Sequence, residues 1–421
     1  MGTSALKRSG LRTLPPVGAP VHFSETIAAL RDAVRPPLGR GAASHDLLNQ
    51  MRQIAGLKHW IFTDSGRSAL SVVLMTLKEL YPDRDEVVIP AYTSYSVAAA
   101  VVRAGLRVQL CDVELETLGI CPKALLRVLT PETLCVIPHH LYGVPCQIKA
   151  ICEIGREYGI PIVEDAAQAM GCSYLENPLG SFGEANIFSL SRGKSLPAAG
   201  GGLIGTRDEV FADRCRRMLG RVASPPETAR SLGIGSALEA AVRGLFMRPS
   251  LYWVPASLPF LGLGQSIYEP NFLIRPMSKF QEQLASRLLP GLDRLVAIRQ
   301  RNAGRLRRAL SELPGLSIIW PAVDKGKNGC LRLPILVKDS VRRNRMLREL
   351  QRQGLGTTCG YPLPLSNLPE LRSKLTGSVG EFPVARQISE QLITLPTHPD
   401  VTDNDMDRMV EVLRRCIQKP L

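Results

Sequence analysis

Residues 163–202 read VEDAAQAMGCSYLENPLGSFGEANIFSLSRGKSLPAAGGG, and this stretch decides the fold. It continues an apolar run, 160–163 (IPIV), with Asp165 just beyond its end. A second short apolar run, 186–190 (NIFSL), is followed by a lone lysine, Lys194, between two small residues. Short β-rich runs bounded by glycines are typical of buried strands. The stretch therefore predicts two strands that end near an acid and an amine.

The same kind of run recurs on both sides of this stretch, from about Trp60 to Thr206. Further strands are expected at 59–63, 86–90, 107–113, 134–140 and 201–206. Amphipathic helices are expected at 68–81, 94–105 and 147–159. Strand–helix alternation predicts an α/β fold with a mainly parallel sheet, of the seven-stranded type, that helices cover on both faces. Ligands then bind at the carboxyl ends of the strands.

The chain is organised differently after residue 277. Residues 278–313 predict a long helical stretch that breaks or kinks at Pro290. A strand is expected within 329–339 and helices within 341–354 and 403–416. We therefore predict three parts: an N-terminal segment at 1–40, a large ligand-binding domain at 41–277, and a smaller C-terminal α+β domain at 278–421.

An insertion at 221–276 interrupts the pattern between the two domains. Its part at 245–264 is rich in proline and aromatic residues. One interpretation is an irregular loop packed at a domain or subunit interface, because the proline spacing forbids a clean amphipathic helix. The alternative is a surface that makes weak peripheral contact with a membrane or a lipid-linked substrate.

The bulk composition restricts the partners. The formal net charge of +14 and the pI of about 9.5 suit an anionic ligand, but no nucleic-acid-binding motif accompanies the basic residues, so no nucleic-acid partner is expected. The 10 cysteines are scattered without a CxxC pair, which argues against disulfides and a metal site and fits a reducing cytoplasm. The N-terminus has no apolar signal-peptide core.

Lys194 and Asp165 together are the pattern that a pyridoxal phosphate (PLP) enzyme needs. A desolvated lysine can bind the cofactor aldehyde covalently, and a carboxylate can keep the pyridine nitrogen protonated. Each residue also has an ordinary interpretation, a surface lysine and a helix-capping aspartate. Gln168 follows Asp165 closely enough to reach the phenolic oxygen of the same ligand.

Phosphate binding is expected at a turn that opens a helix. Residues 65–68 (SGRS) supply such a turn, where the backbone amides of Gly66 and Arg67 can hold an anion. Ser189 offers a hydroxyl nearby in sequence to Lys194. An ordinary turn and helix cap would look the same in the sequence.

Three further residues are candidates for substrate contact. His139 and His140 end a predicted strand, so at most one of them faces the site, and His140 is our candidate for contact with the substrate. Tyr361 and His398 could reach the cleft from the small domain. Roles in packing or in turns are equally compatible with their sequence context.

Several motifs together resemble the DegT/StrS-type sugar aminotransferases, which are PLP enzymes of the aspartate aminotransferase fold, type I. The motifs run in family order: SGRSAL (65–70), VVIPAYTS (87–94), CDVELETLGI (111–120), HLYGVP (140–145), VEDAAQAMG (163–171), FSLSRGKSLPAAGGG (188–202) and LPTHPDVTDNDMDRMVEVL (395–413). The resemblance covers most of the chain.

The resemblance implies the roles of the site residues. Lys194 binds PLP covalently and shuttles a proton, Asp165 contacts the pyridine nitrogen, and Gln168 contacts the phenolic oxygen. The phosphate group is held by Ser189 with the Gly66 and Arg67 amides. A homodimer with shared sites is implied as well, and Asn271 is our candidate for the residue that a partner chain contributes.

The chain departs from the family pattern at two positions. Ser94 stands where the family commonly has an aromatic residue that stacks on the PLP ring, which leaves its neighbours Tyr92 and Tyr95 as candidates for that contact. Gly200 stands where a glutamate is often found.

The sequence thus predicts a transaminase that moves an amino group from glutamate or a similar donor to a keto group of a nucleotide-activated sugar, in the biosynthesis of polysaccharide or cell-surface glycans. A sugar dehydratase of this family would have histidine in place of Lys194. A non-catalytic regulatory or scaffold protein on the same fold, and a PLP enzyme for a lipid-linked or non-sugar ketone, stay open as alternatives.

Overall fold

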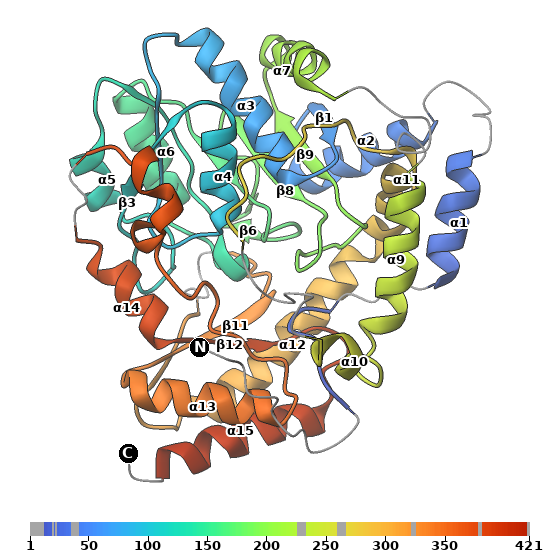
Figure 1. The fold of residues 1–421 in the computed structure, drawn as a ribbon, viewed down its shortest axis with the longest axis vertical. Coiled ribbons are helices and arrows are strands. Elements are labelled where there is room, and N and C mark those ends of the chain that lie inside the picture. Colours follow the sequence, from blue (N-terminus) through green and yellow to red (C-terminus); the bar gives the residue numbers. More distant parts are fainter. Residues whose placement is uncertain are drawn as a thin grey trace.

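The computed structural model describes residues 12–18, 21, 23–34, 42–224, 233–258, 267–320, 326–377 and 381–418. Figure 1 shows a larger part around a central sheet, coloured blue to green, and a smaller part coloured orange to red. Among the described residues, no helix is both long and apolar enough to cross a lipid bilayer.

The larger part is built on a central sheet. Its strands are β1 (His59–Thr63), β2 (Glu86–Pro90), β3 (Arg107–Cys111), β4 (Thr133–Val136), β5 (Val163–Asp165), β8 (Ala185–Ser189) and β9 (Gly202–Thr206). Two groups, β3-β2-β4 and β5-β8-β9-β1, are joined by parallel bridges between Val136 and Ile162 and between His139 and Asp165. Every strand predicted in this region is present.

The sheet is mainly parallel, as predicted, with β9 as its antiparallel member. β9 pairs antiparallel with both β8 and β1, whereas β5 pairs parallel with β8, and β2 pairs parallel with β3 and β4. The connection at 190–201 contains no helix, and parallel neighbours need a helical crossover. The chain therefore turns back after β8, and Lys194 lies in this turn.

Helices cover both faces of the sheet. They are α3 (Gly66–Leu80), α4 (Tyr95–Arg103), α5 (Pro122–Val128), α6 (Ile148–Glu157) and α7 (Glu209–Val222). Side chains of a strand alternate between faces, so Val87 and Ile89 of β2 enter the cluster formed with α3, α4 and α7. Val88 enters the second cluster, which includes α6. A strand that is buried on both faces needs apolar side chains on both, which explains a nearly continuous apolar run such as EVVIP in β2.

The smaller part is an antiparallel sheet covered by helices. It contains α12 (Leu292–Leu310), β10 (Leu316–Ile318), β11 (Arg332–Val337), α13 (Ser340–Arg352), η5 (Leu365–Asn367), η6 (Pro369–Lys374), α14 (Pro383–Gln391), β12 (Leu392–Pro396) and α15 (Asp403–Gln418). The predicted break at Pro290 is confirmed, because the 3-10 turn η3 (Leu289–Gly291) separates α11 (Lys279–Leu288) from α12. The strands β10 and β12 were not predicted.

The N-terminal region contacts both parts. Helices α1 (Phe23–Val34) and α2 (Ala42–Ala55) pack on α11 (Figure 1). Residues 12–18 instead lie on the smaller part, where Leu14 joins the core and its amide donates to the Gly354 carbonyl at 2.8 Å. This segment thereby reaches the region between the two parts.

The insertion is more regular than predicted. It contains the 13-residue helix α9 (Ile234–Phe246), which packs on α1, and the short helix α10 (Trp253–Ala256). The expectation of an irregular segment at 221–276 was therefore wrong for its first half, since prolines begin only at residue 249 within the described residues. Residues 225–232 and 259–266 lie outside the described residues.

The larger part also contains two short strands, β6 (Ser173–Tyr174) and β7 (Asn177–Pro178), and the 3-10 turn η1 (Leu141–Gly143).

Candidate active site

A cavity of about 230 Å³ lies at the carboxyl ends of β5 and β8. Seven predicted site residues are on its wall, namely Gly66, Arg67, His140, Asp165, Gln168, Ser189 and Lys194. They come from α3, β5, β8 and the segments that follow β4, β5 and β8. The parallel strands bring these distant segments to one edge of the sheet.

Lys194 occupies a tight turn of the connection between β8 and β9. Gly193 has a φ of 82°, a conformation that glycine adopts without strain, and the Lys194 amide donates to the Ser191 carbonyl at 3.3 Å. Burial lowers the pKa of the Lys194 amine, and the charge of Asp165 acts in the opposite direction. A lysine with a lowered pKa is a better nucleophile near neutral pH.

Asp165 and Glu164 show how strand alternation sorts two adjacent acids. Asp165 lies at the end of β5 on the cavity wall, where its Oδ1 accepts from the Ala167 amide at 3.0 Å. Glu164 points to the other face, where it is fully buried and accepts from the amides of Gly180 at 2.5 Å and Phe182 at 2.7 Å. Only Asp165 can contact a ligand in the cavity.

Gln168 connects the cavity wall to two tyrosines. Its Oε1 accepts from the Tyr142 amide at 2.9 Å, and its Nε2 lies 3.4 Å from the Tyr361 hydroxyl. The amide side chain is therefore held from both ends, by the Tyr142 amide and by the Tyr361 hydroxyl.

The opposite end of the cavity is formed by the first turn of α3. Ser65 caps the helix, since its Oγ accepts from the Ser68 amide at 3.2 Å. The free amides of the first turn and the hydroxyl of Ser189 form an anion-binding arrangement. The Arg67 guanidinium lies 4.7 Å from the Phe272 ring centroid and its Nη1 donates to the Glu269 carbonyl at 3.4 Å, so that side chain is engaged elsewhere.

Gly66 is needed for the close approach of α3 to β8. A Cβ at this position would lie 3.0 Å from the Cβ and 3.1 Å from the Oγ of Ser189. We expect Gly66→Ala to displace Ser189 and to weaken PLP binding by roughly tenfold, the loss of about one charge-assisted hydrogen bond. Gly220→Ala on α7 is the matched control, because a Cβ there meets nothing within 4 Å. Equal cofactor affinity in the two variants, by fluorescence titration, would contradict this expectation.

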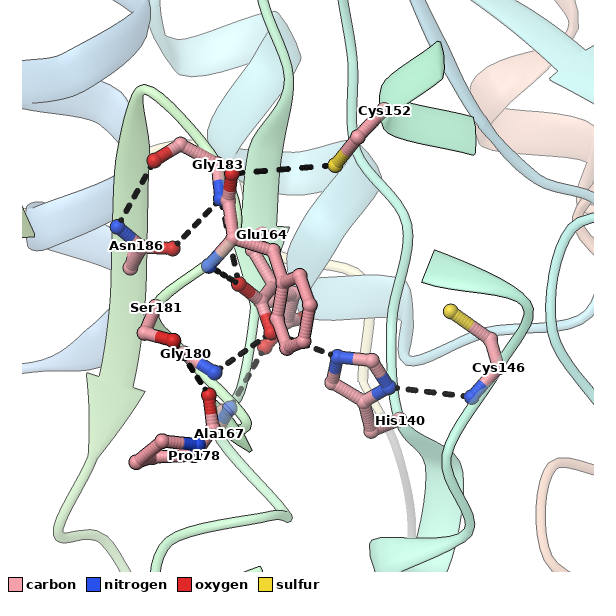
Figure 2. A network of polar contacts seen from close by, with 12 residues as sticks. His140, Cys146, Cys152, Glu164, Ala167, Pro178, Gly180, Ser181, Gly183 and Asn186 are labelled. Atoms are coloured by element: carbon pink, nitrogen blue, oxygen red, sulfur yellow. Dashed lines mark hydrogen bonds and ion pairs between the residues drawn. The ribbon is translucent and has the colours of Figure 1, made fainter. Parts of the chain in front are cut away.

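The histidine pair is placed the opposite way from the prediction. Figure 2 shows the His140 side chain directed toward Glu164, with Nε2 2.9 Å from Oε1, while its Nδ1 accepts from the Cys146 amide at 3.2 Å. The His140 side chain is fully buried. The expectation that the His140 ring contacts substrate is therefore corrected, because Glu164 and Cys146 hold the ring in the core, although the residue is part of the cavity wall.

His139 is the residue that the sequence interpretation missed. It lies on the cavity wall, with Nδ1 2.8 Å from the Thr93 hydroxyl and Nε2 2.9 Å from the Leu118 carbonyl. A carbonyl only accepts, so Nε2 donates and Nδ1 accepts from Thr93. Burial lowers the pKa of His139 to about 4. No Phe, Tyr or Trp lines this cavity within the described residues, so the neutral His139 ring is its aromatic surface.

Tyr92 and Tyr95 are not on this wall. The Tyr92 hydroxyl accepts from the Tyr361 amide at 3.0 Å, and the Tyr95 hydroxyl donates to the Leu363 carbonyl at 3.1 Å. Their rings lie 5.7 and 5.9 Å from the Tyr361 ring. The structure thus places them beside the segment at 359–363, and Thr93, Ser94, Ser96 and Val97 are the residues of this region at the cavity.

The remaining candidates fall in three different environments. Tyr361 lines a second cavity of about 330 Å³ that shares Gln168 and Lys194 with the first. His398 is 1% exposed, and its Nε2 donates to the Pro15 carbonyl at 3.0 Å, so it supports the N-terminal segment and does not reach the cavity. Asn271 is exposed on the surface of this chain.

Taken together, a buried lysine of lowered pKa, a strand-end carboxylate and a helix N-terminus on an α/β sheet define the class of PLP enzymes with fold type I. The donors on the wall match the chemistry of that cofactor: an amine for the aldehyde, a carboxylate for the ring nitrogen, and amides with a hydroxyl for the phosphate. No cluster of residues that could hold a metal ion is present in the described part of the chain.

The chain belongs to the DegT/DnrJ/EryC1/StrS aminotransferase family, whose profile matches residues 24–238 and 273–414. It is therefore an aminotransferase, and relatives of this fold are solved in PLP and PMP (pyridoxamine phosphate) forms. It is 26% identical over 409 residues to the spore coat polysaccharide biosynthesis protein SpsC of Bacillus subtilis (strain 168). The alignment covers 96% of this chain and 97% of that protein.

Solved structures show the same fold. The PseC aminotransferase of Helicobacter pylori, involved in the biosynthesis of pseudoaminic acid, has a TM-score of 0.77 at 16% identity and covers 97% of this chain and 100% of that one. DesI, solved in the presence of its TDP-sugar product, has a TM-score of 0.76 at 20% identity. The match covers 99% of this chain and 95% of DesI.

Proposed function

We propose that this aminotransferase moves an amino group from an amino acid donor, glutamate, to a keto group of a nucleotide-activated sugar used in polysaccharide or cell-surface glycan biosynthesis. The observation that carries the proposal is the Lys194–Asp165 pair on the wall of a cavity that shares Gln168 and Lys194 with a second, larger one. The similarity to SpsC and to DesI supports a sugar substrate.

The residues of the cavity have separate tasks in this proposal. Lys194 holds PLP covalently and moves a proton at the carbon that exchanges the amino group. Asp165 contacts the pyridine nitrogen, and Gln168 contacts the phenolic oxygen. Ser189 and the amides of Gly66 and Arg67 hold the phosphate. When bound, PLP supplies the electron sink that the chain itself lacks.

The test is the visible absorbance of the purified protein with PLP, before and after glutamate. A cofactor band that collapses with glutamate supports the proposal, and release of 2-oxoglutarate identifies the donor. Absence of any cofactor band would favour the non-catalytic alternative. Turnover with a panel of nucleotide-linked ketosugars and with ketones that carry no sugar then separates the sugar from the non-sugar substrate.

Asp165 provides a second test of the same site. We expect Asp165→Asn to lower kcat/KM at least roughly 100-fold, because a neutral amide no longer keeps a pyridine nitrogen protonated. Asp213→Asn is the control, since that carboxylate is exposed and pairs with Arg216 on its own helix. An Asp165→Asn enzyme with unchanged kcat/KM in the transamination assay would remove Asp165 from the proposed mechanism.

We propose a homodimer, with Asn271 at the partner's site, in a cytoplasmic enzyme. Multi-angle light scattering and the effect of Asn271→Ala on cofactor retention test this assembly. For the alternative of a membrane contact, residues 245–258 expose Leu245, Trp253 and Leu258, while 259–264 lie outside the described residues. Flotation with anionic vesicles tests that contact, and absence of binding would exclude it.

A further inference from the structure

Two segments of this chain lie outside the residues that the family profile matches. The profile matches residues 24–238 and 273–414. The structure describes residues 12–18 ahead of the first matched range and residues 239–258 in the gap between the two ranges. A feature that these two segments build together belongs to this chain and not to the pattern that the family shares.

The N-terminal segment 12–18 is held on the smaller part. Arg12 Nη2 donates to Asp405 Oδ2 at 2.9 Å, and the Asp405 side chain is almost fully buried. His398, which is buried as well, donates from Nε2 to the Pro15 carbonyl at 3.0 Å. Contacts with buried partners at two points fix the short stretch of chain beside them.

The turn that follows α9 lies against this segment. The Thr13 amide donates to the Pro249 carbonyl at 2.8 Å. The Tyr252 amide donates to the Arg248 carbonyl at 2.8 Å and closes the turn that leads into α10. Pro249 and Tyr252 are both buried, and Figure 1 shows the dark-blue start of the described chain beside α10. The two segments therefore form one continuous surface, although they are far apart in the sequence.

This combined surface is part of the wall of the second cavity. That cavity has a volume of about 330 Å³ and shares Gln168 and Lys194 with the first. The two segments contribute four uncharged residues to its wall, namely Pro16, Val17, Met247 and Tyr252. Val17 also lies close to the loop of Lys194, since a Cβ at Gly193 would be 3.9 Å from Val17 Cγ2. The surface is thus placed beside the amine of the proposed mechanism.

The apolar character of the surface restricts the groups that it favours. Pro16, Val17 and Met247 are half-buried, so each keeps apolar area that a ligand in the cavity can cover. Covering this area with an apolar group is favourable. A hydroxyl or a carboxylate that loses its water there finds no hydrogen-bond donor or acceptor on these three side chains, which is costly. The surface therefore favours an uncharged apolar group.

We propose that the segments at 12–18 and 247–252 select the ketone acceptor through contact with an uncharged apolar group that it carries. The inference rests on the proposed transaminase function and adds the surface that decides between acceptors. The side chain of the donor glutamate ends in a carboxylate and offers no such group. The contact therefore acts on the reaction with the acceptor.

A comparison of matched acceptors tests the proposal. Each pair consists of two nucleotide-linked ketosugars that differ in one substituent, which is methyl against hydroxymethyl in one pair and acetamido against hydroxyl in the other. We expect wild type to favour the more apolar member of at least one pair by at least roughly tenfold in kcat/KM, since one methylene in an apolar pocket discriminates about 10- to 200-fold. Val17→Ser combined with Met247→Ser should reduce this preference at least roughly fivefold, because hydroxyls then replace the apolar contact.

Thr13→Val is the matched control on the same segment. Thr13 is buried and lines neither cavity, and its Oγ1 has no hydrogen-bond partner. This nearly isosteric change should keep the preference of wild type. If the variant with both serines does not fold, Val17→Ser alone decides by the same comparison, since Val17 is only half-buried.

The outcomes separate this inference from the proposed function. An equal preference in wild type and in the variant with both serines overturns the inference, and so does a wild type that favours the apolar member of neither pair. Both results leave the proposed function intact when the cofactor band collapses with glutamate and the ketosugars react. A wild type without any cofactor band, or one that reacts with no ketosugar, refutes the proposed function and this inference together.

Discussion

Replacing Lys194 with alanine is expected to abolish amino transfer, with turnover falling at least roughly 10³-fold. General acid–base catalysis alone contributes about 10²- to 10⁴-fold, and Lys194 also attaches the cofactor covalently in the proposed mechanism. Its environment agrees with both tasks, because burial lowers the pKa of its amine while Asp165 keeps a counter-charge nearby. Alanine can neither attach the cofactor nor carry a proton.

The measurement combines activity with absorbance. In Lys194→Ala, the visible band of the covalently held cofactor should be absent, and dialysis should remove PLP that wild type retains. Lys123→Ala is the control, because Lys123 is exposed on α5. An active Lys194→Ala enzyme with a normal melting temperature would show that another residue performs the chemistry.

Breaking the buried pair of His140 and Glu164 is expected to have the largest effect on stability. Both side chains are fully buried, and they lie 2.9 Å apart on the far side of β5 from the cavity (Figure 2). We expect His140→Leu to lower the free energy of unfolding by about 3 kcal/mol or more, because the Glu164 carboxylate then stays buried without the hydrogen bond that His140 Nε2 donates. Glu164 adjoins Asp165, so cofactor affinity should fall as well.

A double-mutant cycle separates the pair from other packing effects. The variant with both His140→Leu and Glu164→Gln should recover part of the stability that His140→Leu loses, because it no longer buries an uncompensated charge. Urea unfolding followed by circular dichroism gives the free energies. If the losses of the two single variants simply add, the pair is not coupled and this interpretation is wrong.

The sequence by itself determined the strands along the chain and the convergence of Asp165, Gln168, Ser189 and Lys194. Strand-length apolar runs, amphipathic helical stretches and the turn at 65–68 are local signals, because burial on two faces requires continuous apolar strands. Asp165, Gln168, Ser189 and Lys194 follow strands whose carboxyl ends meet at one edge of a mainly parallel sheet. Their convergence in one cavity follows from that topology.

Only the tertiary structure decided which side chains face the cavity. Alternation along β5 predicts that Glu164 and Asp165 diverge, but the bridge between His139 and Asp165 decides that His139 faces the ligand side. The antiparallel direction of β9 depends on a connection without a crossover helix, which no local pattern specifies. The anchoring of residues 12–18 at Pro249 and Gly354 is likewise set by contacts between distant segments.

Arg332 shows the same limit most clearly. In the sequence it lies in LRLPILV, where an arginine at a strand end resembles an ordinary solvated charge. Its burial results from the segment at Gly356 and from strand β12, where the carbonyls of Gly356 and Thr394 accept from its guanidinium. Local sequence therefore determined the elements and the cofactor end of the site. Long-range packing decided the environment of each charge, because desolvation depends on every segment that surrounds it.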